Sequence, residues 1–159
     1  MKQLQSAFTF EELSIQELSH EEGRLVEAAL KAADNAYAPY SNFHVGAAVA
    51  LDDGTIVIGA NQENAAFPSG LCAERTALFA AQAQYPNHRV TMLAIAARNE
   101  DGVVAQPVTP CGACRQVIAG VEDRQGTPMK VFLYGTDCIY RIHSAKDLLP
   151  LAFADASMR

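Results

Sequence analysis

The sequence lacks the features of a membrane-spanning or secreted protein. Its longest apolar stretch, residues 45–51, is far shorter than the roughly 20 apolar residues that a transmembrane helix needs. Residues 1–5 contain no apolar signal core, and the chain has no internal repeat, low-complexity tract or interdomain linker. We therefore expect a single domain over residues 1–159 in the cytoplasm, with no membrane partner and with residues 1–19 as a polar N-terminal arm.

Positive charge is also scarce. Twelve Lys and Arg residues stand against 18 Asp and Glu residues, which gives a formal net charge of -6. Proteins that bind nucleic acid broadly need clustered cations to displace counterions, so this balance argues against a nucleic-acid partner. An acidic surface is compatible with a small neutral substrate. Because 50% of the 159 residues are hydrophobic, the chain is long and apolar enough to bury a core.

Cysteine is sparse, at four residues. Four thiols in a short secreted chain would suggest two disulfides, but without a signal sequence we expect free thiols in a reducing compartment. Three of them lie in two segments, Cys72-Ala73-Glu74-Arg75 and Pro110-Cys111-Gly112-Ala113-Cys114. Three protein ligands leave the fourth position of zinc open for water, whereas structural zinc sites close with four. A ligand-x-Glu element followed by Pro-Cys-x-x-Cys is the pattern of zinc nucleobase deaminases.

Other interpretations of these residues stay open. Cys111 and Cys114 could form a redox pair at a helix start. Glu74 could serve only to cap a helix. Cys138 could be a fourth ligand, which would close the site and make it structural, although we favour an ordinary strand cysteine because cysteines bury readily.

Helical periodicity and turn residues predict the first half of the fold. Ser19 and Glu22 resemble a capping box at the start of a helix that ends near Ala36. Asp52-Asp53-Gly54 predicts a hairpin turn between a strand at 43–51 and its partner at 55–60.

Small residues and alternation predict how the elements pack. The Gly46-Ala47-Ala48 run predicts that another element packs closely against its strand, and a helix at 71–84 is the candidate. Later elements are strands at 90–97, 129–134 and 139–143 and helices at 111–121 and 145–149. Alternating strands and helices predict a layered α/β fold with a mixed sheet.

Five motifs occur in the order found in the small cytidine deaminase family, which the chain resembles from residue 40 to residue 153. The matching segments are 40–48, 61–65, 72–77, 110–116, and Leu148-Leu149-Pro150 with Phe153. The resemblance implies a three-layer α/β/α fold with a mixed five-stranded sheet. It also implies one zinc ion per chain, a nucleoside substrate, and the homotetrameric assembly of relatives with three cysteines.

The resemblance assigns roles around the metal. Cys72, Cys111 and Cys114 would hold zinc, and Glu74 would move protons between water and substrate. Three thiolates would make the site net negative and weaken its effect on water. Two helix N-termini oppose that charge, and the resemblance implies that Arg75 hydrogen-bonds to the ligand sulfurs.

The resemblance also assigns the substrate contacts. Asn61 and Glu63 would bind the ribose hydroxyls, and the Glu63 carboxylate would reject phosphate. Phe43 would lie against the base, as aromatic rings do for flat ligands. Backbone groups near Ala73 would hold the edge of the base, and Phe153 would reach the pocket of a neighbouring subunit.

Together these assignments imply an enzyme, a zinc-dependent hydrolase of pyrimidine salvage. It would convert cytidine and 2′-deoxycytidine to uridine and 2′-deoxyuridine plus ammonia, using zinc-activated water with Glu74 as the proton shuttle. The alternative is deamination of another aminopyrimidine nucleoside, such as an antibiotic analogue, and a non-enzymatic zinc module is less favoured. The chain departs from many relatives at Phe67, where a Tyr is usual, so any hydroxyl bond from that position is lost.

Overall fold

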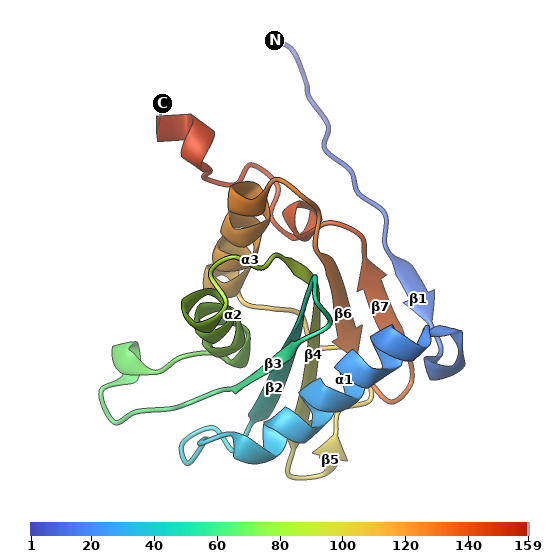
Figure 1. The fold of residues 1–159 in the computed structure, drawn as a ribbon, viewed down its shortest axis with the longest axis vertical. Helices are drawn as coiled ribbons and strands as arrows, with labels where there is room; N and C mark the ends of the chain where they lie inside the picture. The colour runs from blue at the N-terminus through green and yellow to red at the C-terminus, as the bar shows by residue number, and fades with distance from the viewer. Residues whose placement is uncertain (159) are drawn as a thin grey trace.

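The fold has three layers, with a mixed β-sheet between helices on both faces (Figure 1). The computed structural model describes residues 1–158. Helix α1 (His20–Ala32) covers one face of the sheet, and α2 (Ala73–Gln84) and α3 (Gly112–Gln125) lie side by side on the other. The predicted α/β/α architecture is therefore confirmed.

The sheet contains seven strands within residues 1–158, in the order β1-β7-β6-β4-β2-β3, with β5 paired to β4. Among the strand pairs of the described residues, only β4–β6 is parallel. The strands are β1 (Glu11–Leu13), β2 (His44–Leu51), β3 (Ile56–Ala60), β4 (Val90–Asn99), β5 (Gly102–Val103), β6 (Lys130–Tyr134) and β7 (Ile139–Ile142).

The prediction of five strands was therefore wrong by two, because β1 and β5 are too short for alternation to reveal them. Strand β1 lies in the segment expected to be a polar arm and pairs with the edge strand β7. The Glu11 carboxylate on this strand accepts a hydrogen bond from Arg141 of β7, which holds the short strand in place. Residues 1–10, which precede it, are exposed.

Short 3-10 turns connect several elements. The last predicted helix, at 145–149, is one of these turns rather than an α-helix. In the part of the chain that the structure describes there are five such turns: Ile15–Glu17, Ala33–Asn35, Phe67–Ser69, Ala145–Leu148 and Asp155–Met158. None of the helices within residues 1–158 combines the length and the apolar character needed to span a bilayer.

Helix α1 begins at the predicted capping box. The Ser19 Oγ accepts a hydrogen bond from the backbone N–H of Glu22, and the Glu22 Oε2 accepts one from the backbone N–H of Ser19. These bonds satisfy backbone donors that the first helical turn leaves unpaired. The predicted apolar face is also buried, with Leu25, Val26 and Ala29 at most 1% exposed.

Alternate side chains of β2 point to opposite layers. Ala47, Val49 and Leu51 pack in the core beneath α2 and α3. Ala48 and Ala50 pack in the core beneath α1. The hairpin from β2 to β3 turns at Asp52-Asp53-Gly54 as predicted, and Gly54 takes the left-handed conformation with φ of 86°.

Two glycines allow helices to touch the sheet. A Cβ at Gly46 would lie 2.0 Å from the Ala29 carbonyl oxygen, so α1 packs on this point of β2. The expectation that the helix at 71–84 packs on the 46–48 run was therefore wrong for Gly46, whose open side faces the α1 layer. Helix α2 instead approaches β3 at Gly59, where a Cβ would lie 2.4 Å from the Ala77 nitrogen. Both contacts are closer than ordinary van der Waals packing permits for any other residue.

Candidate active site

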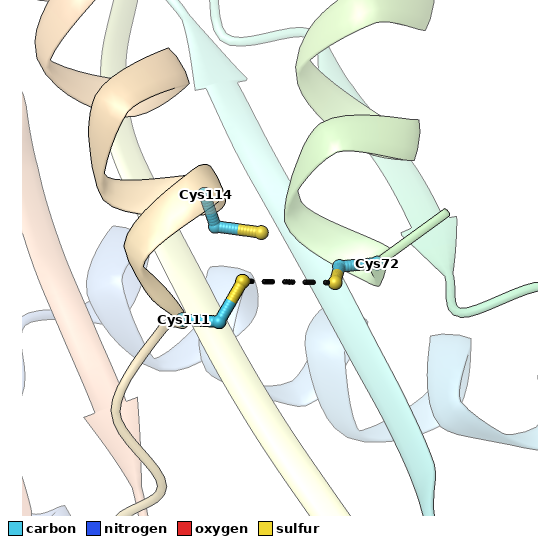
Figure 2. Close-up of side chains that lie close together, drawn as sticks. All are labelled: Cys72, Cys111 and Cys114. Atoms are coloured by element: carbon cyan, nitrogen blue, oxygen red, sulfur yellow. Dashed lines mark hydrogen bonds between the residues drawn. The ribbon is translucent and has the colours of Figure 1, made fainter. Parts of the chain in front are cut away.

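Three thiols meet where α2 and α3 begin. Cys72 and Cys111 are the N-cap residues of the two helices, and Cys114 lies in the first turn of α3. Their sulfur atoms all lie within 4.8 Å of one another, and Figure 2 shows the three side chains converging. The Cys72 and Cys111 sulfurs are 3.9 Å apart. Tetrahedral zinc with Zn–S bonds of about 2.3 Å places sulfur pairs about 3.8 Å apart, so the group could hold zinc.

The two helix starts have no side-chain cap. Neither the Cys72 nor the Cys111 side chain accepts a capping hydrogen bond from its helix. Each helix N-terminus carries the equivalent of about half a positive charge. Two such ends next to one another favour negatively charged thiolates between them, as the sequence predicts.

Arg75 adds a positive charge to the cluster. Its Nη2 donates a hydrogen bond to the Cys72 sulfur at 3.4 Å. The hydrogen bond from Cys114 and, to a smaller extent, that from Arg75 lower the pKa of the Cys72 thiol to about 5. The same contact with Cys72, together with burial, raises the pKa of the Cys114 thiol. Metal ligands of this type must be deprotonated, and the low pKa of Cys72 favours its thiolate before a metal binds.

Glu74 is a buried acid in the first turn of α2. Glu74 is only 5% exposed, and its carboxyl lies next to the thiol group. Burial raises the pKa of the Glu74 carboxyl, and the negative charge of Cys72 raises it further, while a hydrogen bond from Cys114 acts in the opposite direction. A carboxyl with a raised pKa beside a metal-binding group is suited to accepting and donating a proton.

Asn61 and Glu63 lie just after β3, where hydrogen bonds fix both side chains. The Asn61 amide accepts from the Val45 backbone N–H at 2.8 Å and donates to the Phe43 carbonyl oxygen at 2.9 Å. The Glu63 Oε2 accepts from the backbone N–H of Tyr40 at 2.8 Å. A hydrogen bond from the Ser41 side chain, and then the one from Tyr40, lower the pKa of the Glu63 carboxyl, so this group is a carboxylate at neutral pH.

A cleft of about 420 Å³ joins these polar residues to the thiol group. It therefore connects the predicted ribose contacts with Cys72, one of the three predicted metal ligands. Its lining includes Tyr40, Asn61, Glu63, Phe67, Leu71, Cys72 and Arg75.

Other predicted contacts lie beside the cleft or away from it. Phe43 is half-buried, and its carbonyl oxygen accepts the hydrogen bond from the Asn61 amide, while Ala73 is fully buried. Phe153 is 62% exposed and lies against α3, where the Gln116 side chain donates to its carbonyl oxygen. The chain does not bring Phe153 into the lining of its own cleft.

Cys138 does not join the metal-binding group within the described chain. It lies in the hairpin between β6 and β7, where its carbonyl oxygen accepts from the Gly135 N–H. A second group of possible ligands, Asp52, Asp53 and His88, is exposed. In that group the His88 Nδ1 lies 2.8 Å from the Asp52 Oδ1, so an ion pair accounts for the proximity.

Sequence reasoning missed the backbone contacts that hold the site together. It treated Tyr40 and Ser41 only as part of a motif, although their N–H groups hold Glu63. Arg115, which lies in the matching segment 110–116, donates to the carbonyl oxygens of Pro110 and Leu148 and so braces the approach to Cys111. Side chain–backbone bonds of this kind leave no periodic pattern in a sequence.

Three layers of α/β/α structure with paired helix N-termini, three thiols and a buried carboxyl define the class of zinc-dependent deaminases. The family described as "Cytidine and deoxycytidylate deaminase zinc-binding region" matches residues 19–126. The chain belongs to this family and is a zinc-dependent hydrolytic deaminase.

Curated proteins and solved structures agree with this assignment. The chain is 42% identical to a cytidine deaminase of Halalkalibacterium halodurans over 137 residues, which cover 84% of this chain and 95% of that protein. It is 43% identical to a cytidine deaminase of Sporosarcina psychrophila over 131 residues, 82% of this chain and 90% of that protein. A crystal structure of cytidine deaminase from Burkholderia pseudomallei aligns with a TM-score of 0.69 and 42% identity, covering 86% of this chain and 100% of that one.

Proposed function

We propose that this protein deaminates cytidine and 2′-deoxycytidine hydrolytically, giving uridine and 2′-deoxyuridine plus ammonia in pyrimidine salvage. The observation that carries the proposal is the position of Glu74, a buried acid beside three thiols, one of which, Cys72, lines a cleft together with Asn61 and Glu63. The similarity to curated cytidine deaminases over most of the chain supports the choice of substrate. A cytoplasmic location stays a prediction.

Each residue has one task in the proposed reaction. Zinc held by Cys72, Cys111 and Cys114 would supply the polarisation that lets water act as a nucleophile near neutral pH. Glu74 takes a proton from the water that attacks C4 and delivers it to the pyrimidine ring nitrogen. It then moves a second proton, from the hydroxyl now bonded to C4, to the amine, so that the C4–N bond breaks, ammonia leaves and the C4 carbonyl forms. Arg75, hydrogen-bonded to Cys72, offsets the negative charge of the thiolates.

Substrate selection rests on the cleft. Asn61 and the ionised Glu63 bind the ribose hydroxyls, and the Glu63 carboxylate repels the phosphate of a nucleotide. Phe43 lies against the pyrimidine ring, and the backbone near Ala73 holds its edge. A site built around substrate hydroxyls discriminates against a ligand that lacks them, so free cytosine is expected to react poorly.

The central test is Glu74→Gln, which keeps the shape of the side chain and removes the proton acceptor. The variant is expected to keep its zinc and its fold but to lose activity by about 10²–10⁴-fold or more, because general acid–base catalysis contributes on that scale. Loss of cytidine is followed by ultraviolet absorbance, with 2′-deoxycytidine, cytosine and CMP as parallel substrates.

Glu22→Gln provides the matched control. Glu22 is also buried and also lies in the first turn of a helix, but on α1, across the sheet from the thiols. Glutamine also serves in a capping box, so this variant should keep nearly full activity. Turnover of Glu74→Gln at the level of Glu22→Gln would refute the proposed mechanism.

We further propose a homotetramer in which Phe153 completes the cleft of a neighbouring subunit. Phe67 and Phe153 are 74% and 62% exposed in the single chain, and such rings are commonly covered when subunits assemble. Mixing inactive Glu74→Gln subunits with Phe153→Ala subunits tests the proposal. Some mixed sites would combine an intact Glu74 with a neighbour's intact Phe153, so activity should exceed the average of the two parents. Strict averaging after verified subunit exchange would overturn it.

A further inference from the structure

The turn before β2 has an unusual residue at its end. Asn42 adopts the left-handed conformation, with φ of 53°, and its N–H donates to the Ala38 carbonyl oxygen at 3.0 Å. This conformation is costly for most residues with a side chain, and asparagine is among those that adopt it most readily. The conformation of Asn42 sets the direction in which the chain leaves the turn and enters β2 at His44.

The Asn42 side chain ties this turn to a distant part of the chain. Its Nδ2 donates to the Glu100 Oε1 at 3.1 Å, across 58 positions of sequence. Glu100 lies in the tight turn between β4 and β5. In this turn the Asp101 N–H donates a hydrogen bond of 2.9 Å to the Asn99 side-chain oxygen. A charged acceptor makes the bond from Asn42 to Glu100 stronger than one between neutral groups.

The same turn holds three of the proposed substrate contacts. The Tyr40 and Ser41 N–H groups donate to the Glu63 carboxylate. The Ser41 Oγ accepts from the Phe43 N–H at 3.1 Å, and the Phe43 carbonyl oxygen accepts from the Asn61 amide. A displacement of this turn would therefore move Glu63, Phe43 and Asn61 together.

We propose that Asn42 and Glu100 are positioning residues for the sugar-binding side of the cleft. Their hydrogen bond anchors the 40–43 turn to the β4–β5 turn and thereby sets the positions of Asn61 and Glu63. The inference rests on the proposed function, since it concerns how tightly the ribose is bound. Neither residue lines the cleft or touches the thiol group, so the effect belongs to nucleoside binding and not to the chemical step.

Exchanging the donor and the acceptor provides the test. Asn42→Asp places two carboxylates opposite one another, and the KM for cytidine should rise about three- to tenfold, the range of one hydrogen bond, while kcat stays within twofold. Adding Glu100→Gln supplies a new amide donor facing the new acceptor, so the double variant should return to within twofold of the parent KM. The activity of each variant on free cytosine should change less than its activity on cytidine, because cytosine has no ribose and only the Phe43 contact with its ring is shared.

Two further variants separate positioning from general damage. Asn42→Gly keeps the left-handed turn without strain but removes the bond to Glu100, so its KM should also rise, by no more than that of Asn42→Asp, which adds repulsion between two carboxylates. Asn87→Asp makes the same chemical change in the exposed loop before β4, at the opposite end of that strand, and should leave the KM unaltered.

The outcomes distinguish this inference from the proposed function. If the parent enzyme leaves cytidine unchanged, the proposed function fails, and the inference fails with it. If the parent deaminates cytidine but Asn42→Asp and Asn42→Gly both keep the parent KM, only the inference is overturned. A double variant no better than Asn42→Asp alone would overturn it as well, because the hydrogen bond would then not be the cause.

Discussion

Replacing Gly59 by alanine is expected to weaken metal binding from a position that holds no ligand. Gly59 lies in β3 directly beneath α2, the helix whose N-cap is Cys72. An added Cβ would lie 2.4 Å from the Ala77 nitrogen and 2.6 Å from the Ala73 carbonyl oxygen. Both atoms belong to the helix backbone, so no side-chain rotation relieves the overlap and α2 as a whole must move.

The geometry sets the size of the effect. Restoring an ordinary contact requires α2 to retreat by about 1 Å. Metal sites tolerate departures of about 0.2 Å in ligand distance, so a helix displaced by this amount carries Cys72 out of range of the two α3 thiols. Overpacking of this kind costs about 1–3 kcal/mol of stability, and we expect zinc affinity to fall at least about tenfold.

Gly46→Ala is the matched variant. Its Cβ would lie 2.0 Å from the Ala29 carbonyl oxygen, so it displaces α1 by at least as much, but on the opposite face of the sheet. Thermal unfolding followed by circular dichroism should show both variants destabilised, and transfer of zinc to a coloured chelator should be faster for Gly59→Ala alone. Gly120→Ala, in a helix where nothing lies within 4 Å of the new Cβ, should stabilise the protein by about 0.5–1 kcal/mol and serves as a positive control.

Equal zinc retention by Gly59→Ala and Gly46→Ala, at equal loss of thermal stability, would refute this reasoning. It would mean that α2 adjusts by bending locally rather than by moving as a unit. Faster zinc release from Gly46→Ala would also contradict it, because the α1 layer contributes no thiol to the site.

The remaining predictions concern a cysteine and a histidine outside the proposed site. Cys138→Ser should retain one zinc per chain by metal analysis, since Cys138 does not join the thiol group; loss of the metal would favour a closed structural site. The hydrogen bond to Asp52 raises the pKa of His88. Because the folded pKa lies above the unfolded value near 6.5, this stabilisation is complete below about pH 6.5 and is lost as pH rises through the raised pKa. In Asp52→Asn, NMR titration should find a lower His88 pKa; an unaltered pKa would contradict the assigned cause.

Local signals in the sequence predicted the elements that carry them. Ser19 and Glu22 form the capping box that begins α1, and Gly54 adopts the positive φ that the hairpin requires. The grouping of Cys72 with Cys111 and Cys114 also follows a recognisable spacing, because each thiol stands at or near a helix start. These features depend on residues close in sequence or on a pattern whose chemistry is known.

Contacts between distant segments were beyond such reasoning. The partner of Gly46 is α1 rather than α2, and no property of the 46–48 run distinguishes the two faces of its strand. The hydrogen bond from Asn42 to Glu100 joins two polar turns, and the sequence of each turn is typical of an exposed loop. Strand β1 forms because β7 offers an unpaired edge, which depends on the rest of the sheet being in place.

At the two N-cap positions, Cys72 and Cys111, a substitution that raises the thermal stability of the metal-free chain would lower its affinity for the metal. Serine and aspartate are among the best residues at a helix N-cap and are worth about 1 kcal/mol there. Cys72→Ser or Cys111→Asp would therefore give the metal-free chain a better helix end while removing a thiol. Directed evolution that selects for thermal stability in the presence of a chelator should accumulate such substitutions and lose the metal site. The same selection with zinc supplied should keep both cysteines, because metal binding then stabilises the native state by mass action.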